Sequence, residues 1–196
     1  LYGGRRDADD EVAPVIFLNS GVVTYYTAGS NRITGSSTLS ANSWHHISVE
    51  RASGRTKLYV NGIQEGSTYS DSNSYVAKLN RPIIGAGDAF GSAFSGYISN
   101  VRLCKGHAVY TSNFLPPSGP LTNITGTSIL CCQSNSSTTA STVSAGTITA
   151  NGDPAAGAQT VAYSGTNTLN NGTITWPERV KWNGEITPTL FSNKRD

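Results

Sequence analysis

The amino-acid sequence predicts an all-β fold, an antiparallel sandwich followed by a smaller C-terminal β unit. Charged residues make up only 13% of the 196 residues, about half the ~25% of an average domain. Ser and Thr together supply about a quarter of the chain, Val and Tyr are abundant, and Met is absent. Because β-branched and aromatic residues fit the half-buried surface of a sheet, this composition favours strands over helices.

Short strand-like runs recur between turn residues, at the spacing typical of a sandwich. The runs predicted as early strands are Val15–Leu18, Val22–Thr27, Trp44–Arg51 and Lys57–Val60. Asn61-Gly62 follows the last of them directly, and Asn-Gly readily adopts the two positive φ angles of a type I′ hairpin turn. Ser53-Gly54 predicts the preceding hairpin, so Trp44–Gln64 is expected to form a three-stranded antiparallel meander.

Alternation assigns the two faces of this meander. Ile47 and Val49 share one side of their strand, and Leu58 and Val60 share one side of theirs. The opposite side carries Ser48, Glu50, Lys57 and Tyr59. One face is therefore expected to pack in the core, and the other to meet solvent or a partner.

A later segment, Phe94–Leu103, alternates again and is predicted as a central strand. Gly96 within it indicates a bulge or a close approach between backbones. Prolines then break regular structure, and Thr127–Gln133 is predicted as the strand that closes the first domain.

Three parts of the chain are expected to have different roles. Residues 1–133 are predicted to form the sandwich, residues 134–144 a Ser/Thr linker, and residues 145–196 a small β assembly unit. The linker has hardly an apolar side chain with which to offset the entropy of ordering. Strands expected in the last unit are Thr147–Ala150, Thr160–Tyr163 and Thr173–Trp176. A chain without Met is expected to be processed or, more simply, a piece of a longer polypeptide.

Charge and cysteine content narrow the classes of function. The net charge is +2 and the positive residues are scattered, so no nucleic-acid partner is expected. No membrane insertion is expected either, because every apolar run is far shorter than the ~20 residues that span a bilayer. Cys104, Cys131 and Cys132 lack the paired spacing of a zinc site. On a strand, Cys131 and Cys132 would point to opposite faces, so we interpret the cysteines as small hydrophobes of a protein assembled in a reducing cytoplasm.

Two groups of residues carry a resemblance to a known fold family. The run Trp44–Val49 with Lys57–Gly62 resembles the central signature of the concanavalin A-like, laminin-G-like jelly roll, and so does Ile83-Ile84-Gly85 followed by 94–102. The resemblance covers roughly residues 12 to 133, and its signature positions are Trp44, Asn61, Gly62, Gly85 and Gly96. It implies a jelly-roll sandwich. The family usually opens with further strands ahead of Leu1, so these are expected to lie upstream or to come from a neighbouring subunit.

A second resemblance concerns the setting of the protein. Residues 106–114 with the following prolines are similar to modules in virion proteins of tailed phages of marine cyanobacteria, and residues 174–190 resemble the terminal β segment of fibre-like proteins. This implies a structural, adhesive component of a virion, a tail fibre or capsid-surface protein that contacts host-surface glycan or neighbouring virion subunits. A homo-oligomer is expected, a trimer if the protein is a fibre. The alternative is a carbohydrate-binding or adhesion module of a cellular surface protein.

No catalytic residues are predicted, and the chain is not expected to be an enzyme. Glycoside hydrolases need two carboxylates that face one sugar bond. The candidate acids are isolated in the sequence: Glu50, Glu65, Asp88, Glu178 and Glu185. The histidines of His45-His46 would diverge on a strand, so they do not predict a catalytic or metal-binding pair.

A group of aromatic and polar loop residues is the candidate for ligand binding, because sugars bind to aromatic faces beside amides and carboxylates. Its members are Tyr69, Asp71, Asn73 and Tyr75, with Asp88 and Phe90 nearby. The alternative is a polar loop whose tyrosines cover a sheet edge. No cofactor is expected. Calcium binding is an alternative, with Asp71, Asp88 or the acids of residues 7–11 as ligands. The cluster at residues 7–11 is, however, more typical of a solvated face.

Overall fold

The computed structural model describes residues 1–4, 12–75, 82–86, 93–157, 166–169 and 172–175. All regular elements in these ranges are strands, which confirms the predicted all-β class. None of the described segments forms a helix long and apolar enough to cross a membrane.

The early strands follow the runs of β-branched and aromatic residues. In chain order they are β1 (Tyr2–Gly3), β2 (Val15–Asn19), β3 (Val22–Thr27), β4 (Ser30–Thr38), β5 (Ile47–Ala52), β6 (Arg55–Val60) and β7 (Ile63–Ser70). The later ones are β8 (Ile83–Ile84), β9 (Val101–Cys104), β10 (Thr127–Cys131), β11 (Ser141–Ser144), β12 (Thr166–Leu169) and β13 (Gly172–Thr175).

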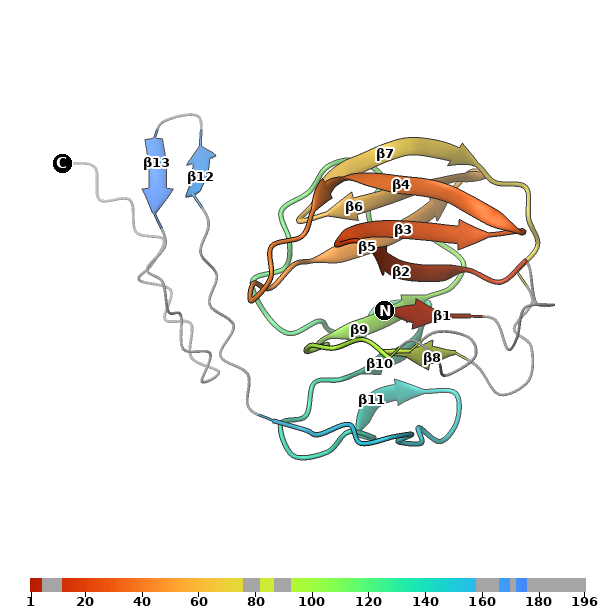
Figure 1. Ribbon diagram of the computed structural model, residues 1–196, viewed down its shortest axis with the longest axis vertical. Coiled ribbons are helices and arrows are strands. Elements are labelled where there is room, and N and C mark those ends of the chain that lie inside the picture. Colours follow the sequence, from red (N-terminus) through yellow and green to blue (C-terminus); the bar gives the residue numbers. More distant parts are fainter. Residues whose placement is uncertain (5–11, 76–81, 87–92, 158–165, 170–171, 176–196) are drawn as a thin grey trace.

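These strands pair antiparallel in several sheets (Figure 1). One sheet has the order β4-β3-β2-β1-β8, and a second is the meander β5-β6-β7. A third sheet has β10 between β9 and β11, and among the described strands β12 and β13 pair only with each other. In Figure 1 the β2–β3–β4 layer lies in front of the β5–β6–β7 layer, as in a sandwich.

The predicted meander and its turns are confirmed. Residues Asn61 and Gly62 have φ angles of 50° and 80°, and Ser53 and Gly54 have φ angles of 48° and 69°. Two consecutive positive φ angles are what a type I′ turn requires, and the twist of this turn matches that of the flanking strands. The strand β5 begins at Ile47, however, and the predicted residues 44–46 before it are not in a strand.

The core lies between the two layers, and its five central side chains are Val23, Tyr25, Ile33, Leu58 and Val60. Ile47 and Val49 pack against it, so the apolar face of the meander is the one that alternation predicted. Full burial of one large apolar side chain stabilises the fold by about 1.5–3 kcal/mol. These contacts hold the two layers together.

The opposite face of the meander is covered by a segment of the same chain. Residues 109–114, which we call the strap, follow β9 and cross β5, β6 and the β6–β7 turn. The Phe114 N–H donates to the Gly62 carbonyl at 2.9 Å, and the Phe114 ring packs on Tyr59 with centroids 5.4 Å apart. Tyr59 is therefore fully buried, although it lies on the face expected to meet solvent or a partner.

A single carboxylate joins the edges of the two layers at β4 and β7. Glu65 of β7 is 7% exposed, and its Oε2 accepts the backbone N–H groups of Ser36 and Ser37 at 3.0 and 3.1 Å. Gly66 of β7 lies so close to β4 that an added Cβ would be 2.5 Å from the Thr34 carbonyl oxygen. The Glu65 carboxylate thus accepts hydrogen bonds from N–H groups of β4, an edge strand, which would otherwise lack a partner.

The predicted strands at 94–103 and 147–150 are wrong, the first in part and the second in whole. Only the end of the run Phe94–Leu103 is a strand, because the left-handed backbone of Asn100 (φ 55°) interrupts the extended chain before β9. The predicted bulge or backbone approach at Gly96 is also wrong, since an added Cβ there would meet the ring of Phe94 rather than another backbone. The run Thr147–Ala150 is not a strand.

The predicted Ser/Thr linker is wrong for four of its residues. Residues 141–144 form β11, which pairs with β10. Backbone hydrogen bonds to a free strand edge suffice for this pairing and do not require the apolar side chains that the linker lacks. The predicted boundary after residue 133 therefore separates two paired strands. Of the predicted C-terminal strands, 173–175 lie in β13, whereas Thr160–Tyr163 and Trp176 lie outside the described residues.

Candidate functional site

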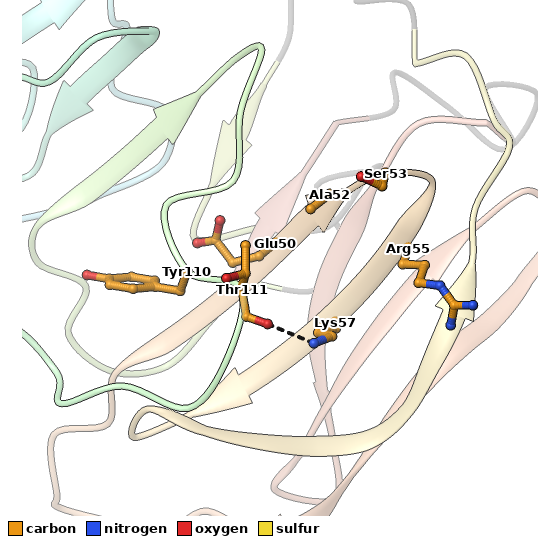
Figure 2. Close-up of a pocket in the computed structure, with 7 residues that line it drawn as sticks. All are labelled: Glu50, Ala52, Ser53, Arg55, Lys57, Tyr110 and Thr111. Carbon is orange, nitrogen blue, oxygen red and sulfur yellow. Dashed lines mark hydrogen bonds between the residues drawn. The ribbon is translucent and has the colours of Figure 1, made fainter.

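The strap and the β5–β6 hairpin enclose a hollow of about 190 Å³ on the outer face of the meander, which we call the outer-face pocket (Figure 2). It is lined by Glu50, Ala52, Ser53, Arg55, Lys57, Tyr110 and Thr111. Arg55 and Lys57 are two residues apart on β6, so they project from the same face of the strand. Figure 2 shows Lys57 bonded to the strap, and Arg55 at the start of β6 with its guanidinium directed away from Tyr110 and Thr111.

The acidic group of this pocket is already satisfied by the protein. One oxygen of Glu50 accepts the Ser48 hydroxyl at 2.5 Å, and the other accepts the Val109 N–H at 2.8 Å. These bonds fasten the start of the strap to β5. Each oxygen of Glu50 is thus engaged by a donor of the protein itself.

The basic groups of the pocket, in contrast, keep free donors. Lys57 donates one hydrogen bond, from Nζ to the Thr111 carbonyl at 2.8 Å, and an ammonium has three donors. Arg55 is exposed and makes no side-chain hydrogen bond or ion pair with any described residue. With one carboxylate and two cations, the pocket has a net positive charge beside the hydroxyls of Ser53 and Thr111. Such a site attracts an anionic group of a ligand.

The aromatic side of the strap is tied into the fold. Tyr110 stacks on Phe114 with ring centroids 3.5 Å apart and an interplanar angle of 5°. The imidazole of His46 contacts both rings edge-on, at centroid distances of 6.3 and 5.4 Å. Burial and the positive charge of Arg102 lower the pKa of His46, so this imidazole is neutral at pH 7. The strap is thereby held in a fixed position over the meander.

A second hollow of about 300 Å³ lies where β4 approaches the β6–β7 turn, lined by Ser37, Thr38, Leu39, His45, Val60, Asn61, Ile63 and Glu65. Its polar groups are largely occupied. The amide of Asn61 bonds to the His46 N–H and to the His45 ring, and the other nitrogen of His45 faces the Ser40 carbonyl at 3.1 Å. This hollow offers a ligand fewer free groups than the outer-face pocket does.

The structure brings together the four described members of the predicted ligand-binding group. The Asn73 amide donates to the Tyr69 hydroxyl and to Asp71 Oδ1, both at 3.1 Å, and the Tyr75 hydroxyl donates to Asp71 Oδ2 at 2.7 Å. Arg32 lies over the Tyr69 ring and Arg51 over the Tyr75 ring, 5.2 and 5.1 Å from their centroids. Asp88 and Phe90 lie outside the described residues.

Asp71 is the buried centre of this group. It is 1% exposed, and Oδ2 also accepts the Thr56 hydroxyl at 2.6 Å. Burial alone would raise the pKa of Asp71, but the hydrogen bonds from Thr56, Tyr75 and Asn73 and the charge of Arg51 outweigh it and lower the pKa. Both oxygens are occupied by the protein's own donors, so Asp71 organises the loop rather than offering a free acceptor.

A laminin-G-like family model, described as the concanavalin A-like lectin/glucanases superfamily, matches residues 9–108. The chain belongs to this superfamily. The matched region runs from before β2 to just past β9, so it contains the two layers and the core of this lectin-like sandwich. Membership suggests a carbohydrate-binding or adhesion module. Comparisons with curated proteins and with solved structures found no match.

Signature residues of this superfamily member lie at turns and between strands. Trp44 precedes β5, and its ring is 6.5 Å from that of Tyr97. Gly85 has a φ of 83°, and its N–H and carbonyl bond to Leu1 and Phe94. Within the described ranges no three His, Cys, Asp or Glu side chains gather in the way a metal site requires.

The outer-face pocket of the lectin-like sandwich was not predicted from the sequence. Its two walls, β6 and the strap, are far apart along the chain. The only signal within β6 was that Arg55 and Lys57 lie on the same side of the strand, opposite the buried Thr56.

Proposed function

We propose that this chain is an adhesive component of a bacteriophage virion, a tail fibre or capsid-surface protein, which binds host-surface glycan in the outer-face pocket. Membership of a lectin-containing superfamily supports binding to carbohydrate. The residues that resemble phage virion modules, 106–114, include the strap that forms one wall of the pocket. The phage-like segment thus contributes Tyr110 and Thr111 to the proposed binding surface, and the β5–β6 hairpin contributes the rest.

The observation that carries the proposal is the set of unused donors in this pocket. Arg55 and Lys57 offer a carboxylate or sulfate several N–H donors, and the hydroxyls of Ser53 and Thr111 match those of a sugar ring. A hollow of about 190 Å³ is smaller than the ~300–1,000 Å³ of a typical drug-sized site. It suits one acidic sugar residue of a longer chain.

The module is proposed to act by binding alone. Hydrolysis of a glycosidic bond needs two carboxyl groups, about 5–5.5 Å or ~6.5–9.5 Å apart, with one free to donate a proton. Among the described residues, Glu50, Glu65 and Asp71 are each engaged in hydrogen bonds that support the fold. None of the three is placed as a free acid beside the pocket's cations.

Calorimetric titration with polysaccharides tests the site. A carboxylated and a sulfated polysaccharide, compared with a neutral one, should bind the wild-type chain preferentially. R55A should weaken binding about tenfold or more, the loss expected for one charge-assisted contact. K105A, which removes an exposed cation beyond the end of β9, is the matched control and should leave the affinity within twofold. Equal binding by wild type and R55A would overturn the assignment of the pocket.

The virion setting is tested separately. Antibodies raised against the sandwich should label purified particles of a phage whose genome encodes this sequence, and light scattering of the isolated chain should give a homo-oligomer, a trimer for a fibre. Glycan binding together with unlabelled particles would instead identify an adhesion module of a cellular surface protein. A strict monomer at all concentrations would count against a fibre.

A further inference from the structure

Cys131 and Cys132 bring their sulfur atoms together at the end of β10. Their Sγ atoms are 3.6 Å apart, and neither is in a disulfide. The prediction that these neighbours point to opposite faces is therefore wrong. The strand ends at Cys131, and Cys132 has a left-handed backbone with a φ of 59°, which turns its side chain back toward its neighbour.

This unusual backbone conformation is held by hydrogen bonds from the segment before β9. The carbonyl of Cys132 accepts the Asn100 N–H at 3.0 Å and the Ser99 hydroxyl at 3.3 Å. The next residue, Gln133, donates from its amide to the Asn100 side chain at 3.0 Å and to the Leu121 carbonyl at 2.8 Å. These contacts at Cys132 and Gln133 hold the backbone turn that brings the two sulfurs together.

The two thiols differ in access and in acidity. Cys131 is 2% exposed, whereas Cys132 is only partly buried. A hydrogen bond from the Cys131 thiol lowers the pKa of Cys132 to about 7, against the opposing effect of burial, and the same contact raises the pKa of Cys131. Since the thiolate is the nucleophile in disulfide exchange, the accessible cysteine is also the more reactive one.

We propose that Cys131 and Cys132 form a redox-active vicinal dithiol, which an external disulfide converts to an intramolecular disulfide. In the first step the Cys132 thiolate attacks one sulfur of a low-molecular-weight disulfide, forms a mixed disulfide and releases one thiolate. In the second step Cys131 loses its proton to solvent and attacks the Cys132 sulfur, which releases the second thiol. The protein loses two electrons and two protons, and the external disulfide is reduced to two thiols.

The resulting bond is expected to be easily reversed. Consecutive Cα atoms are about 3.8 Å apart across a trans peptide, whereas disulfides usually join Cα atoms about 4.4–6.8 Å apart. A strained disulfide is more readily reduced and behaves as a labile, regulatory bond rather than a structural one. Its ring includes the peptide bond between the two cysteines and the Cα atom of Cys132, which carries the Cys132 carbonyl. Closure would therefore act on the hydrogen bonds from Asn100 and Ser99 to that carbonyl, and so on the approach to β9.

Oxidation of the full chain with oxidised glutathione, followed by intact mass and peptide mapping, tests this inference. The wild type should lose two hydrogen atoms within one peptide and regain them with dithiothreitol. C104S, the matched control for the remaining thiol, should behave as the wild type does. C131S should accumulate the glutathione adduct on Cys132, and C132S should react at least tenfold more slowly, since only the buried Cys131 remains at this site.

Because Cys131 is buried, the C131S variant can fail to fold. The C132S variant then still tests the inference, since Cys132 is only partly buried. A wild type that ends as a stable glutathione adduct would overturn the inference. Failure of C104S to form the intramolecular disulfide would also overturn it. An unchanged reaction rate in C132S would do the same.

Discussion

The carboxylate of Asp71 accepts a 2.6 Å hydrogen bond from the hydroxyl of Thr56, and both side chains are about 1% exposed. This bond joins the middle strand of the meander to the segment that follows β7. The Asp71 N–H also bonds to the Gly54 carbonyl at 2.7 Å, and the Asp71 carbonyl accepts Arg51 at 2.9 Å. One residue thus fixes the exit of β7 against the β5–β6 hairpin.

We expect D71N to lower the free energy of unfolding by about 2–3 kcal/mol, because a buried anion that accepts several hydrogen bonds is replaced by a neutral amide. Urea denaturation measures this loss. D153N, which changes an exposed acid, is the control and should lie within about 0.5 kcal/mol of the wild type. Equal stability of D71N and wild type would contradict the structural role of the carboxylate.

The contribution of Asp71 should depend on pH. Its pKa is lower in the folded state than the ordinary value of 3.8, so the folded state is favoured above the unfolded pKa, and this gain is lost as pH falls through the folded pKa. The difference in stability between wild type and D71N should therefore be constant near neutral pH and shrink below about pH 4. A difference that grows on acidification would show the opposite linkage.

Glu65 provides a second test, with two variants of the same side chain. Both hydrogen bonds from β4 end on the same oxygen of Glu65, so the carbonyl of a Gln can replace that oxygen while an Ala cannot. We expect E65A to cost about 2–3 kcal/mol and E65Q about 1 kcal/mol. Hydrogen exchange at the Ser36 and Ser37 amides should be fastest in E65A. Identical exchange in the two variants would argue against the bridge.

Two buried tyrosines should respond in opposite ways to loss of the hydroxyl. The Tyr59 hydroxyl has no hydrogen-bond partner among the described residues, whereas that of Tyr25 is 2.8 Å from the Tyr75 hydroxyl. Removing an unsatisfied buried polar group relieves its desolvation cost, so Y59F should be neutral or up to about 1 kcal/mol more stable. Y25F should lose about 1 kcal/mol. Thermal and urea unfolding of both variants decide the matter, and a destabilised Y59F would contradict it.

The two type I′ turns of the meander allow a comparison at glycine. Gly54 and Gly62 both have positive φ, but an added Cβ would overlap the Phe114 carbonyl oxygen only at Gly62, whereas at Gly54 its nearest contact is 3.5 Å away. G54A should therefore lower the free energy of unfolding by about 1–2 kcal/mol, because only the left-handed backbone opposes an alanine there. G62A should cost more, because the strap must shift. Equal losses in urea unfolding would mean that the strap yields freely.

Binding of acidic polysaccharide should weaken with salt. The screening length falls from about 10 Å at 0.1 M to ~3 Å at 1 M ionic strength, so a contact made by exposed cations is attenuated. Titrations over this range should show a steep salt dependence for the wild type and a shallower one for R55Q and K57Q. A neutral polysaccharide is the reference. Salt-independent binding of the acidic polysaccharide would contradict an electrostatic site.

The meander was predictable because its determinants are local. Asn61-Gly62 and Ser53-Gly54 are turn pairs in which the glycine adopts positive φ at no steric cost, and alternation over six residues assigns Leu58 and Val60 to the core. The same reasoning failed where one residue leaves the extended conformation. Asn100 and Cys132 both adopt left-handed backbone, and the bond between them depends on two segments far apart in the chain.

The ligand-binding group and the pocket differ in the same way. Tyr69, Asp71 and Tyr75 are neighbours in the sequence, so their clustering was predictable, but the burial of Asp71 depends on Thr56 of another strand. The outer-face pocket needs the strap to return across β6. No pattern within either segment indicates that contact.

Residue preferences over a few positions decided the all-β class, the meander and its turns, since φ preference and side-chain alternation act between near neighbours. Folding decided which polar and reactive groups are engaged: Glu65 reaches β4, the strap covers Tyr59, and Cys131 meets Cys132. Each of these contacts needs backbone positions that a distant segment imposes, so it exists only once the layers have packed.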